Sequence, residues 1–280
     1  KSTNKSNEYF ALLSILHPKV FKTYKAFVER YWCKISRKGR NVKELAMILP
    51  LFGFIRRSKE DVLSLPPKFF ETIVVDEPVA KKSIHNLLKE IQDEPDKSMV
   101  RFLIGASYHE LARIKANSDK VKAVYTKVVR DKRPAKMIVF CQHLDMLAKA
   151  EEWARESGVE KIEVIHGGVS AHARNVIVHS FQSGNVDILC CTIPAAGVGL
   201  TLTAATEVIF LEINWQRGLM QQSIDRAHRI GQTQPVTVTK IVCEGSLDDW
   251  IVRSANGKKK MQTLLLHASR KLSTDDGLCK

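Results

Sequence analysis

The chain has 280 residues, of which 44% are hydrophobic and 26% charged; this excludes a disordered polypeptide and suffices for one large domain or two small ones. No apolar run reaches the ~20 residues that a membrane-spanning helix needs, and no signal-peptide core follows the polar residues 1–7. The formal net charge of +14 favours a polyanionic partner, nucleic acid first, although a basic surface without a partner would have the same composition.

The cysteines argue for a reducing compartment and against a metal site. None of the six forms a C-x-x-C pair, and no Cys/His spacing matches a zinc finger, so we expect no bound metal. Four lie in apolar, strand-like runs, which indicates buried reduced thiols in a cytosolic or nuclear protein. These four are Cys141, Cys190, Cys191 and Cys243.

The first part of the chain, over residues 7–65, has a mainly helical pattern. Apolar residues from Tyr9 to Leu16 share one face, and Pro18 ends that run. A basic, aromatic stretch follows over residues 21–40, and Pro66-Pro67 marks a boundary. We expect a helical linker over residues 1–70.

The second part combines one strand with three helices. Thr72 to Val75 has the composition of a strand, and helical patterns follow over residues 83–92, 102–116 and 119–130, the last with Asp119 as its N-cap. We expect a helical insertion over about residues 79–131.

The third part alternates strands with helices. Apolar runs predict strands over residues 137–141, 162–165, 187–191, 208–211 and 236–242, and amphipathic patterns predict helices over 144–156, 172–181 and 219–228. This alternation predicts an α/β fold with a parallel sheet covered by helices on both faces. Ligands of such sheets bind at the loops that follow the carboxyl ends of strands. The domain is expected to span residues 71–255, before a basic tail over 256–280.

The segment from Gln222 to Gln232 carries the strongest chemical signal. Arg226 and Arg229 are three residues apart at the expected end of a helix, so both guanidinium groups should point in one direction. Two planar, permanently charged groups aimed at one place suit a γ-phosphate whose charge must be stabilised during transfer. The alternative is a solvated basic helix end.

A glycine-rich loop follows the strand at residues 187–191. Gly197 and Gly199 permit positive φ angles and let the backbone approach a phosphate closely. Taken alone, the same pattern is also that of a tight turn.

In this order the motifs resemble those of the Swi/Snf-like DNA-dependent ATPases of superfamily two. Residues 222–232 resemble motif VI in a form different from that of DEAD-box RNA helicases. Residues 187–205 resemble motif V in wording similar to the annealing-helicase branch and its viral and microbial relatives. Residues 136–147 resemble motif IV, and residues 54–68 resemble the interlobe signature of that family. The resemblance covers nearly the whole chain and is weakest over residues 81–131 and after 255.

The resemblance implies a RecA-like second motor lobe of an ATP-dependent translocase on double-stranded DNA, either remodeller-like or fork-annealing. It implies that ATP and Mg²⁺ bind between this lobe and a first lobe, which supplies the phosphate loop and the metal ligands, while Arg226 and Arg229 act as arginine fingers. Gly197, Gly199 and Gln222 would line the ATP cleft. The DNA-binding residues would be Gln142, His143, Gly167, Gly168, Arg174 and Thr192, which face the backbone, and Trp215, which would meet the minor groove. The protein would be intracellular, nuclear in a eukaryote and cytoplasmic in a bacterium or virus.

Several alternatives accompany these assignments. His143 could be an ordinary polar loop residue, and Trp215 a core or lid aromatic. Residues 73–77 are similar to a Walker B strand, but the sequence contains no Gly-x-x-x-x-Gly-Lys-Ser/Thr, so we expect no chemistry there and no ATP hydrolysis by this chain alone. A non-catalytic DNA-binding module and an RNA helicase lobe are the rival functions. The intact Arg226, Arg229 and Gln222 argue against the first, and the Ile-Gly-Gln ending argues against the second.

Overall fold

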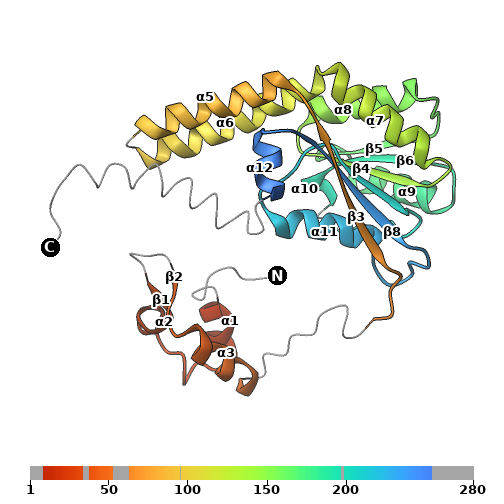
Figure 1. Ribbon diagram of the computed structural model, residues 1–280. Helices are drawn as coiled ribbons and strands as arrows, with labels where there is room; N and C mark the ends of the chain where they lie inside the picture. The colour runs from red at the N-terminus through yellow and green to blue at the C-terminus, as the bar shows by residue number, and fades with distance from the viewer. Residues whose placement is uncertain (1–8, 34–37, 53–62, 95, 197–198, 254–280) are drawn as a thin grey trace. The chain divides into compact units, whose positions relative to one another are not determined.

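The computed structural model describes residues 9–33, 38–52, 63–94, 96–196 and 199–253, and the chain divides into two compact units over residues 1–64 and 65–280 (Figure 1). In the described ranges, no helix combines the length and the apolar character needed to cross a membrane. Gly197, most of the interlobe signature and the basic tail lie outside the described residues, so the expectations placed on them stay predictions.

The first unit is a small helical domain. Its buried core consists largely of aromatic rings, with Phe27 in contact with Phe21, Phe10 and Tyr31 at centroid distances of 4.8–5.9 Å. Edge-on and tilted rings at these distances add to the burial of apolar area, which explains how so short a segment forms a core. Two antiparallel strands of two residues each follow the second helix, and the sequence pattern did not predict them. The elements are α1 (Tyr9–Leu16), α2 (Tyr24–Tyr31), β1 (Trp32–Cys33), β2 (Lys38–Gly39) and α3 (Val42–Leu51).

The second unit is built on a six-stranded, all-parallel sheet in the order β3-β8-β7-β4-β6-β5. The central strands β4 and β6 are buried along their whole length, as expected for strands covered on both faces. Strand β3 begins at Lys68, four residues before the predicted start, because it pairs with β8 along its full length. The strands are β3 (Lys68–Val75), β4 (Met137–Cys141), β5 (Ile162–Ile165), β6 (Ile188–Thr192), β7 (Glu207–Phe210) and β8 (Val236–Cys243).

The helices cover both faces of this sheet, and the α/β class predicted from the sequence is confirmed. Right-handed crossovers place α7 and α8 on one face, since the chain moves from β3 to β4 to β5 in one direction. The return path from β5 through β6 and β7 to β8 places α9, α10 and α11 on the opposite face. The helices are α7 (Asp119–Lys132), α8 (Leu144–Glu156), α9 (Ala171–Gln182), α10 (Ile193–Ala196), α11 (Arg217–Ala227) and α12 (Leu247–Arg253).

This strand order creates a switch point at β4. The chain leaves β4 toward one face of the sheet, whereas it leaves the neighbouring strands β6 and β7 toward the other face. The crossovers that follow these strands therefore diverge, and open α/β sheets bind their ligands at such a switch point.

A helical insertion separates β3 from β4. Helices α5 (Pro78–Asp93) and α6 (Lys97–Ala116) form an antiparallel pair that extends beyond the sheet (Figure 1) and has a small core of its own. Both begin about five residues earlier than predicted. The N-cap of α7 is Ser118, whose hydroxyl accepts a hydrogen bond from the Val121 amide at 3.3 Å, so the assignment of Asp119 as the cap was wrong. Asp119 occupies the first turn instead, where a carboxylate also suits the helix dipole.

Candidate functional site

The loops after β4 and β7 are joined by the buried carboxylate of Glu212, which is 2% exposed. Glu212 Oε2 accepts hydrogen bonds from the backbone amides of Gln142 at 2.7 Å and His143 at 2.9 Å. Its Oε1 lies 2.6 Å from Nδ1 of His143. Because a carboxylate offers only acceptors at neutral pH, these donors offset the cost of burying it. Glu212 therefore fixes both the backbone and the ring of the residues predicted to meet DNA.

The same two loops share a second polar contact and an aromatic one. Asn214 Nδ2 donates to Oε1 of Gln142 at 2.8 Å. The ring of Tyr108, from α6, lies 4.9 Å from Trp215 and 5.3 Å from His143 between centroids. Trp215 is half-buried and packs against the main core. Both expectations, a core aromatic and a surface residue that contacts DNA, therefore describe part of its side chain.

Thr192 ends β6 and pairs with Cys141, directly beside the Gln142 loop. Its side chain is buried, which the sequence did not predict. The chain then forms the single helical turn of α10 before the glycine-rich loop, so the strand does not deliver that loop directly. Gly199 has a φ of +51°, a left-handed conformation that favours glycine.

The loop after β5 places Gly167 and Gly168 at the surface. The Gly168 amide donates to Nδ1 of His166 at 3.1 Å, and a Cβ on Gly168 would lie 3.0 Å from Cε1 of that ring. A side chain at 168 would therefore displace the His166 ring slightly, whereas Gly167 has open space around its Cα. Arg174 Nη2 donates to the carbonyl of Val169 at 3.2 Å, which ties the loop to α9.

Arg226 and Arg229 do not lie on one helix, so the geometric premise drawn from their spacing was wrong. Helix α11 ends at Ala227, and Arg229 follows in a turn. Arg229 Nη1 donates to Oγ1 of Thr201 at 3.0 Å and to the carbonyl of Leu200 at 3.4 Å. The glycine-rich loop and the end of α11 therefore form one unit, in which tertiary contacts orient the second arginine.

The two arginines are nevertheless close enough to affect each other. Burial lowers the pKa of the Arg226 guanidinium, the positive charge of Arg229 lowers it further, and Asp225 opposes both effects. Two like charges held together in a partly buried place disfavour each other, and an anion bound between them would relieve that repulsion. Gln222, on the same helix, is exposed.

The side chain of Gln232 makes hydrogen bonds to several backbone groups around the end of α11. Its Nε2 lies within 3.3 Å of the carbonyls of Thr203, Ala205 and Ala227, and its Oε1 accepts from the amides of Thr233 and Gln234. The side chain is buried, and it joins the glycine-rich segment to the end of α11. The final Gly-Gln of the motif is thus an architectural feature, which the sequence alone did not reveal.

His228 connects this unit to the segment before the sheet. Its Nε2 lies 2.8 Å from the carbonyl of Pro66, to which it can only donate. The Leu-Pro-Pro segment that opens the second unit is thereby joined to the end of α11.

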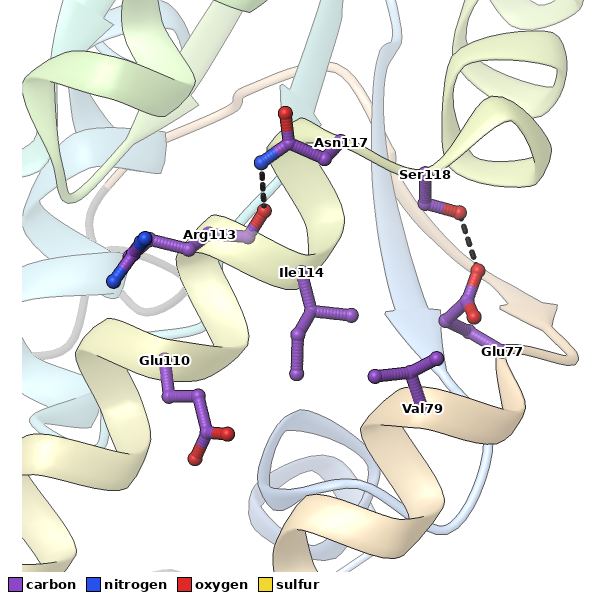
Figure 2. Close-up of a pocket in the computed structure, with 7 residues that line it drawn as sticks. All are labelled: Glu77, Val79, Glu110, Arg113, Ile114, Asn117 and Ser118. Carbon is purple, nitrogen blue, oxygen red and sulfur yellow. Dashed lines mark hydrogen bonds between the residues drawn. The ribbon is translucent and has the colours of Figure 1, made fainter.

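The acidic residues of the Walker B-like segment contact other side chains of the second unit. A hydrogen bond from Lys81, together with its charge, lowers the pKa of the Asp76 carboxyl, and the two groups are 2.8 Å apart. Glu77 accepts a hydrogen bond from Ser118 at the rim of a pocket of about 470 Å³ between α5 and α6 (Figure 2). None of the predicted site residues lines that pocket, whose walls are Glu77, Val79, Glu110, Arg113, Ile114, Asn117 and Ser118.

The residues missed by sequence reasoning are those that act through others, namely Glu212, Asn214, Gln232 and Tyr108. A charged residue directly after an apolar strand is the one available signal for Glu212. Gln232 lies within the motif at residues 222–232, but the sequence does not show its structural role, and Asn214 and Tyr108 have no local signature because their partners lie far away in the sequence.

Comparisons with known proteins agree with this arrangement. The family model described as the SNF2-related domain matches residues 2–129, and that of the helicase conserved C-terminal domain matches residues 119–231. The chain is 31% identical over 292 residues to the DNA annealing helicase and endonuclease ZRANB3 of Bos taurus, covering 96% of this chain and 27% of that protein. It is also 31% identical over 260 residues to the Caenorhabditis elegans homolog of SWI/SNF-related matrix-associated actin-dependent regulator of chromatin subfamily A-like protein 1, covering 88% of this chain and 37% of that protein. The chain therefore spans well under half the length of these relatives.

Solved structures support the same fold. The Sulfolobus solfataricus SWI2/SNF2 ATPase core in complex with dsDNA superposes with a TM-score of 0.54 at 22% identity, covering 98% of this chain and 62% of that one. The C-terminal part of the Fun30 ATPase domain gives a TM-score of 0.57 at 15% identity, covering 75% of this chain and 99% of that one. The chain belongs to the SNF2 family of superfamily-two helicase-like ATPases and carries its helicase conserved C-terminal domain.

Proposed function

We propose that this chain is the second motor lobe of an ATP-dependent translocase on double-stranded DNA. The relatives named as annealing helicases, and the SWI2/SNF2 core solved with dsDNA, support DNA as the partner. The net charge of +14 supports a polyanion independently of any relative. The partner lobe would supply the phosphate loop, which this sequence does not contain.

The observation that carries the proposal is the pairing of Arg226 with Arg229. Arg229 is held by Thr201 and Leu200, and its charge is felt by the partly buried Arg226. Two guanidinium groups, one in the last turn of α11 and one anchored to the glycine-rich segment just beyond it, suit the several oxygens of a polyphosphate such as ATP. When bound, ATP supplies the phosphoryl group whose transfer releases energy, and Mg²⁺ would be held by carboxylates of the first lobe.

In this proposal the two arginines stabilise charge that develops on the γ-phosphate. Gly197, Gly199 and Gln222 line the side of the cleft that this lobe contributes. Because the glycine-rich segment is joined to the end of α11 through Gln232, a movement at the arginines is passed to the loop that follows β6. ATP binding would thus be coupled to the carboxyl edge of the sheet.

The loops at the carboxyl ends of the strands would hold the DNA. The loops after β4, β5, β6 and β7 bring Gln142, His143, Thr192 and Trp215 to one end of the sheet, with Gly167, Gly168 and Arg174 on the loop after β5. Backbone contacts give affinity without sequence information, as a motor that moves along DNA requires.

The test uses a protein that contains this chain together with its first lobe. ATP turnover should rise with duplex DNA more than with RNA, and Arg226→Ala should abolish that turnover while DNA affinity stays within about two-fold. Stimulation by RNA alone would favour an RNA helicase. Near-normal turnover combined with lost DNA binding would place these arginines on the DNA and overturn the assignment.

A further inference from the structure

We propose that Glu212 and Tyr108 are positioning residues, which hold the loops after β4 and β7 in the single arrangement that binds DNA. This inference rests on the proposed function, since it assigns a role to two residues that would not themselves contact DNA. Neither belongs to the set predicted from the sequence, and Tyr108 comes from the helical insertion, far from any motif.

Glu212 accepts three of the hydrogen bonds that join these two loops. The loops leave adjacent strands toward opposite faces of the sheet, so the backbone alone lets them diverge. Glu212, on the β7 loop, reaches across and accepts from two successive amides of the β4 loop, at 2.7 and 2.9 Å. Asn214 adds the contact to the Gln142 side chain, so the two loops form one rigid edge.

Glu212 also determines how His143 presents its ring. The Nδ1 atom must donate to the carboxylate 2.6 Å away, because the carboxylate has only lone pairs to offer. The ring plane is thereby fixed, and its Nε2 edge is turned away from Glu212. A ring with a fixed plane loses less entropy when it contacts DNA than one that must first be ordered.

Tyr108 fixes the other side of the edge. Its hydroxyl donates to the carbonyl of Ile213 at 2.7 Å, between Glu212 and Asn214 in the chain. Its buried ring lies between Trp215 and His143. The helical insertion therefore supports the two side chains that the proposed function places against DNA.

The two possible roles of Glu212 predict opposite results for Glu212→Gln. If Glu212 were only a negative charge near a polyanion site, its removal would strengthen duplex binding or leave it unchanged. If it positions the loops, the amide is a poorer replacement: its oxygen can accept from the amides of Gln142 and His143 only without charge assistance, and its NH₂ group then faces Nδ1 of His143, whose ring must change its tautomer. The matched control is Glu163→Gln, an exposed carboxylate on β5 with the same change of charge.

We expect Glu212→Gln to weaken duplex binding by this 280-residue chain about ten-fold, the effect of losing a charge-assisted hydrogen bond. Glu163→Gln should bind as tightly as the unaltered chain or more so. Tyr108→Phe, which keeps the ring and loses the hydroxyl, should weaken binding about three-fold, and Tyr108→Leu should weaken it further. Amide hydrogen exchange at Gln142 and His143 should accelerate in Glu212→Gln while other sheet amides keep their protection.

His143→Ala and Trp215→Ala separate the inference from the function on which it rests. If both weaken binding and Glu212→Gln binds as tightly as Glu163→Gln, the positioning role is wrong and the DNA edge stands. If neither changes binding, the DNA edge itself is wrong. If thermal melting shows that Glu212→Gln does not fold, Tyr108→Phe becomes the test of the positioning role. Unchanged DNA affinity and unchanged amide hydrogen exchange at His143 in that variant would overturn it.

Discussion

The ammonium group of Lys115, near the end of α6, contacts the carboxylate of Asp248 in the first turn of α12, and both side chains are only 1% exposed. Lys115 also donates to the carbonyl of Ile241 in β8 at 2.9 Å. The helical insertion, strand β8 and helix α12 are thus joined at one buried ion pair.

Replacing one partner of this ion pair should destabilise the protein more than replacing both partners. Lys115→Met leaves an unpaired buried carboxylate and should lower the free energy of unfolding by about 3–5 kcal/mol, whereas the double variant Lys115→Met, Asp248→Leu should recover most of that loss. Urea unfolding of the three proteins measures the difference. The control is Lys122→Met, whose partner Glu156 is 45% exposed and whose loss should cost less than about 1 kcal/mol. A double variant no more stable than Lys115→Met would contradict this account.

Gln232→Leu should destabilise the second unit strongly. The substitution leaves three buried carbonyls and two amides without their present partner, and we expect a loss of about 3 kcal/mol. Gln234→Leu, at an exposed side chain two residues away, should change stability by less than about 0.5 kcal/mol. Equal melting temperatures for the two variants would show that the Gln232 network is not important for stability.

Thr201→Val tests the anchor of Arg229. The valine keeps the volume and removes the hydroxyl that accepts from Nη1 at 3.0 Å, while the Leu200 carbonyl remains. Turnover of the two-lobed protein should fall about three- to ten-fold at saturating DNA, the effect of one hydrogen bond. Thr201→Ser should retain near-normal turnover, and a serine variant as slow as the valine variant would exclude the hydroxyl as the anchor.

Arg229→Lys should not rescue Arg229→Ala. Lysine keeps the charge but lacks the planar fork of donors, which matches two phosphate oxygens at once. Arginine fingers contribute roughly 10³ to 10⁵ in turnover in related phosphoryl transfers. Steady-state ATP hydrolysis at saturating DNA is the measurement, and a lysine variant within a factor of three of the unaltered enzyme would refute a role for the fork.

The chain alone should not hydrolyse ATP, because its sequence contains no phosphate loop. The purified 280-residue chain should release phosphate at the background rate with or without DNA. DNA-dependent turnover by this chain would disprove its assignment as one half of a motor.

The chain alone should still bind duplex DNA, weakly and without sequence preference. Each phosphate neutralised adds about −0.9 to the slope of log K against log salt concentration, so the slope counts the contacts. Affinity measured by fluorescence anisotropy at several salt concentrations tests this, with two unrelated duplexes of equal length. A flat salt dependence, or a strong preference for one duplex, would argue against backbone binding.

The sequence by itself determined the class of fold and the position of the motifs. The alternation of apolar strands with amphipathic helices is a local property, and it predicted β4, β5, β6 and β8 to within a residue. Strands buried on both faces need continuous apolar runs, so residues 137–141 and 188–192 could take few other forms. The loops at the carboxyl ends of these strands were then the correct places to look for polar side chains.

Only the tertiary structure decided how those side chains are held. The spacing of Arg226 and Arg229 suggested one shared helical direction, but Arg229 lies beyond the end of α11 and donates to Thr201 and Leu200, 28 and 29 residues away in sequence. Glu212 finds its donors 69 and 70 residues away, across a strand order that no local pattern specifies. A buried polar group must find a partner, but which partner it finds depends on which strands are neighbours, and that is settled only when the whole sheet assembles.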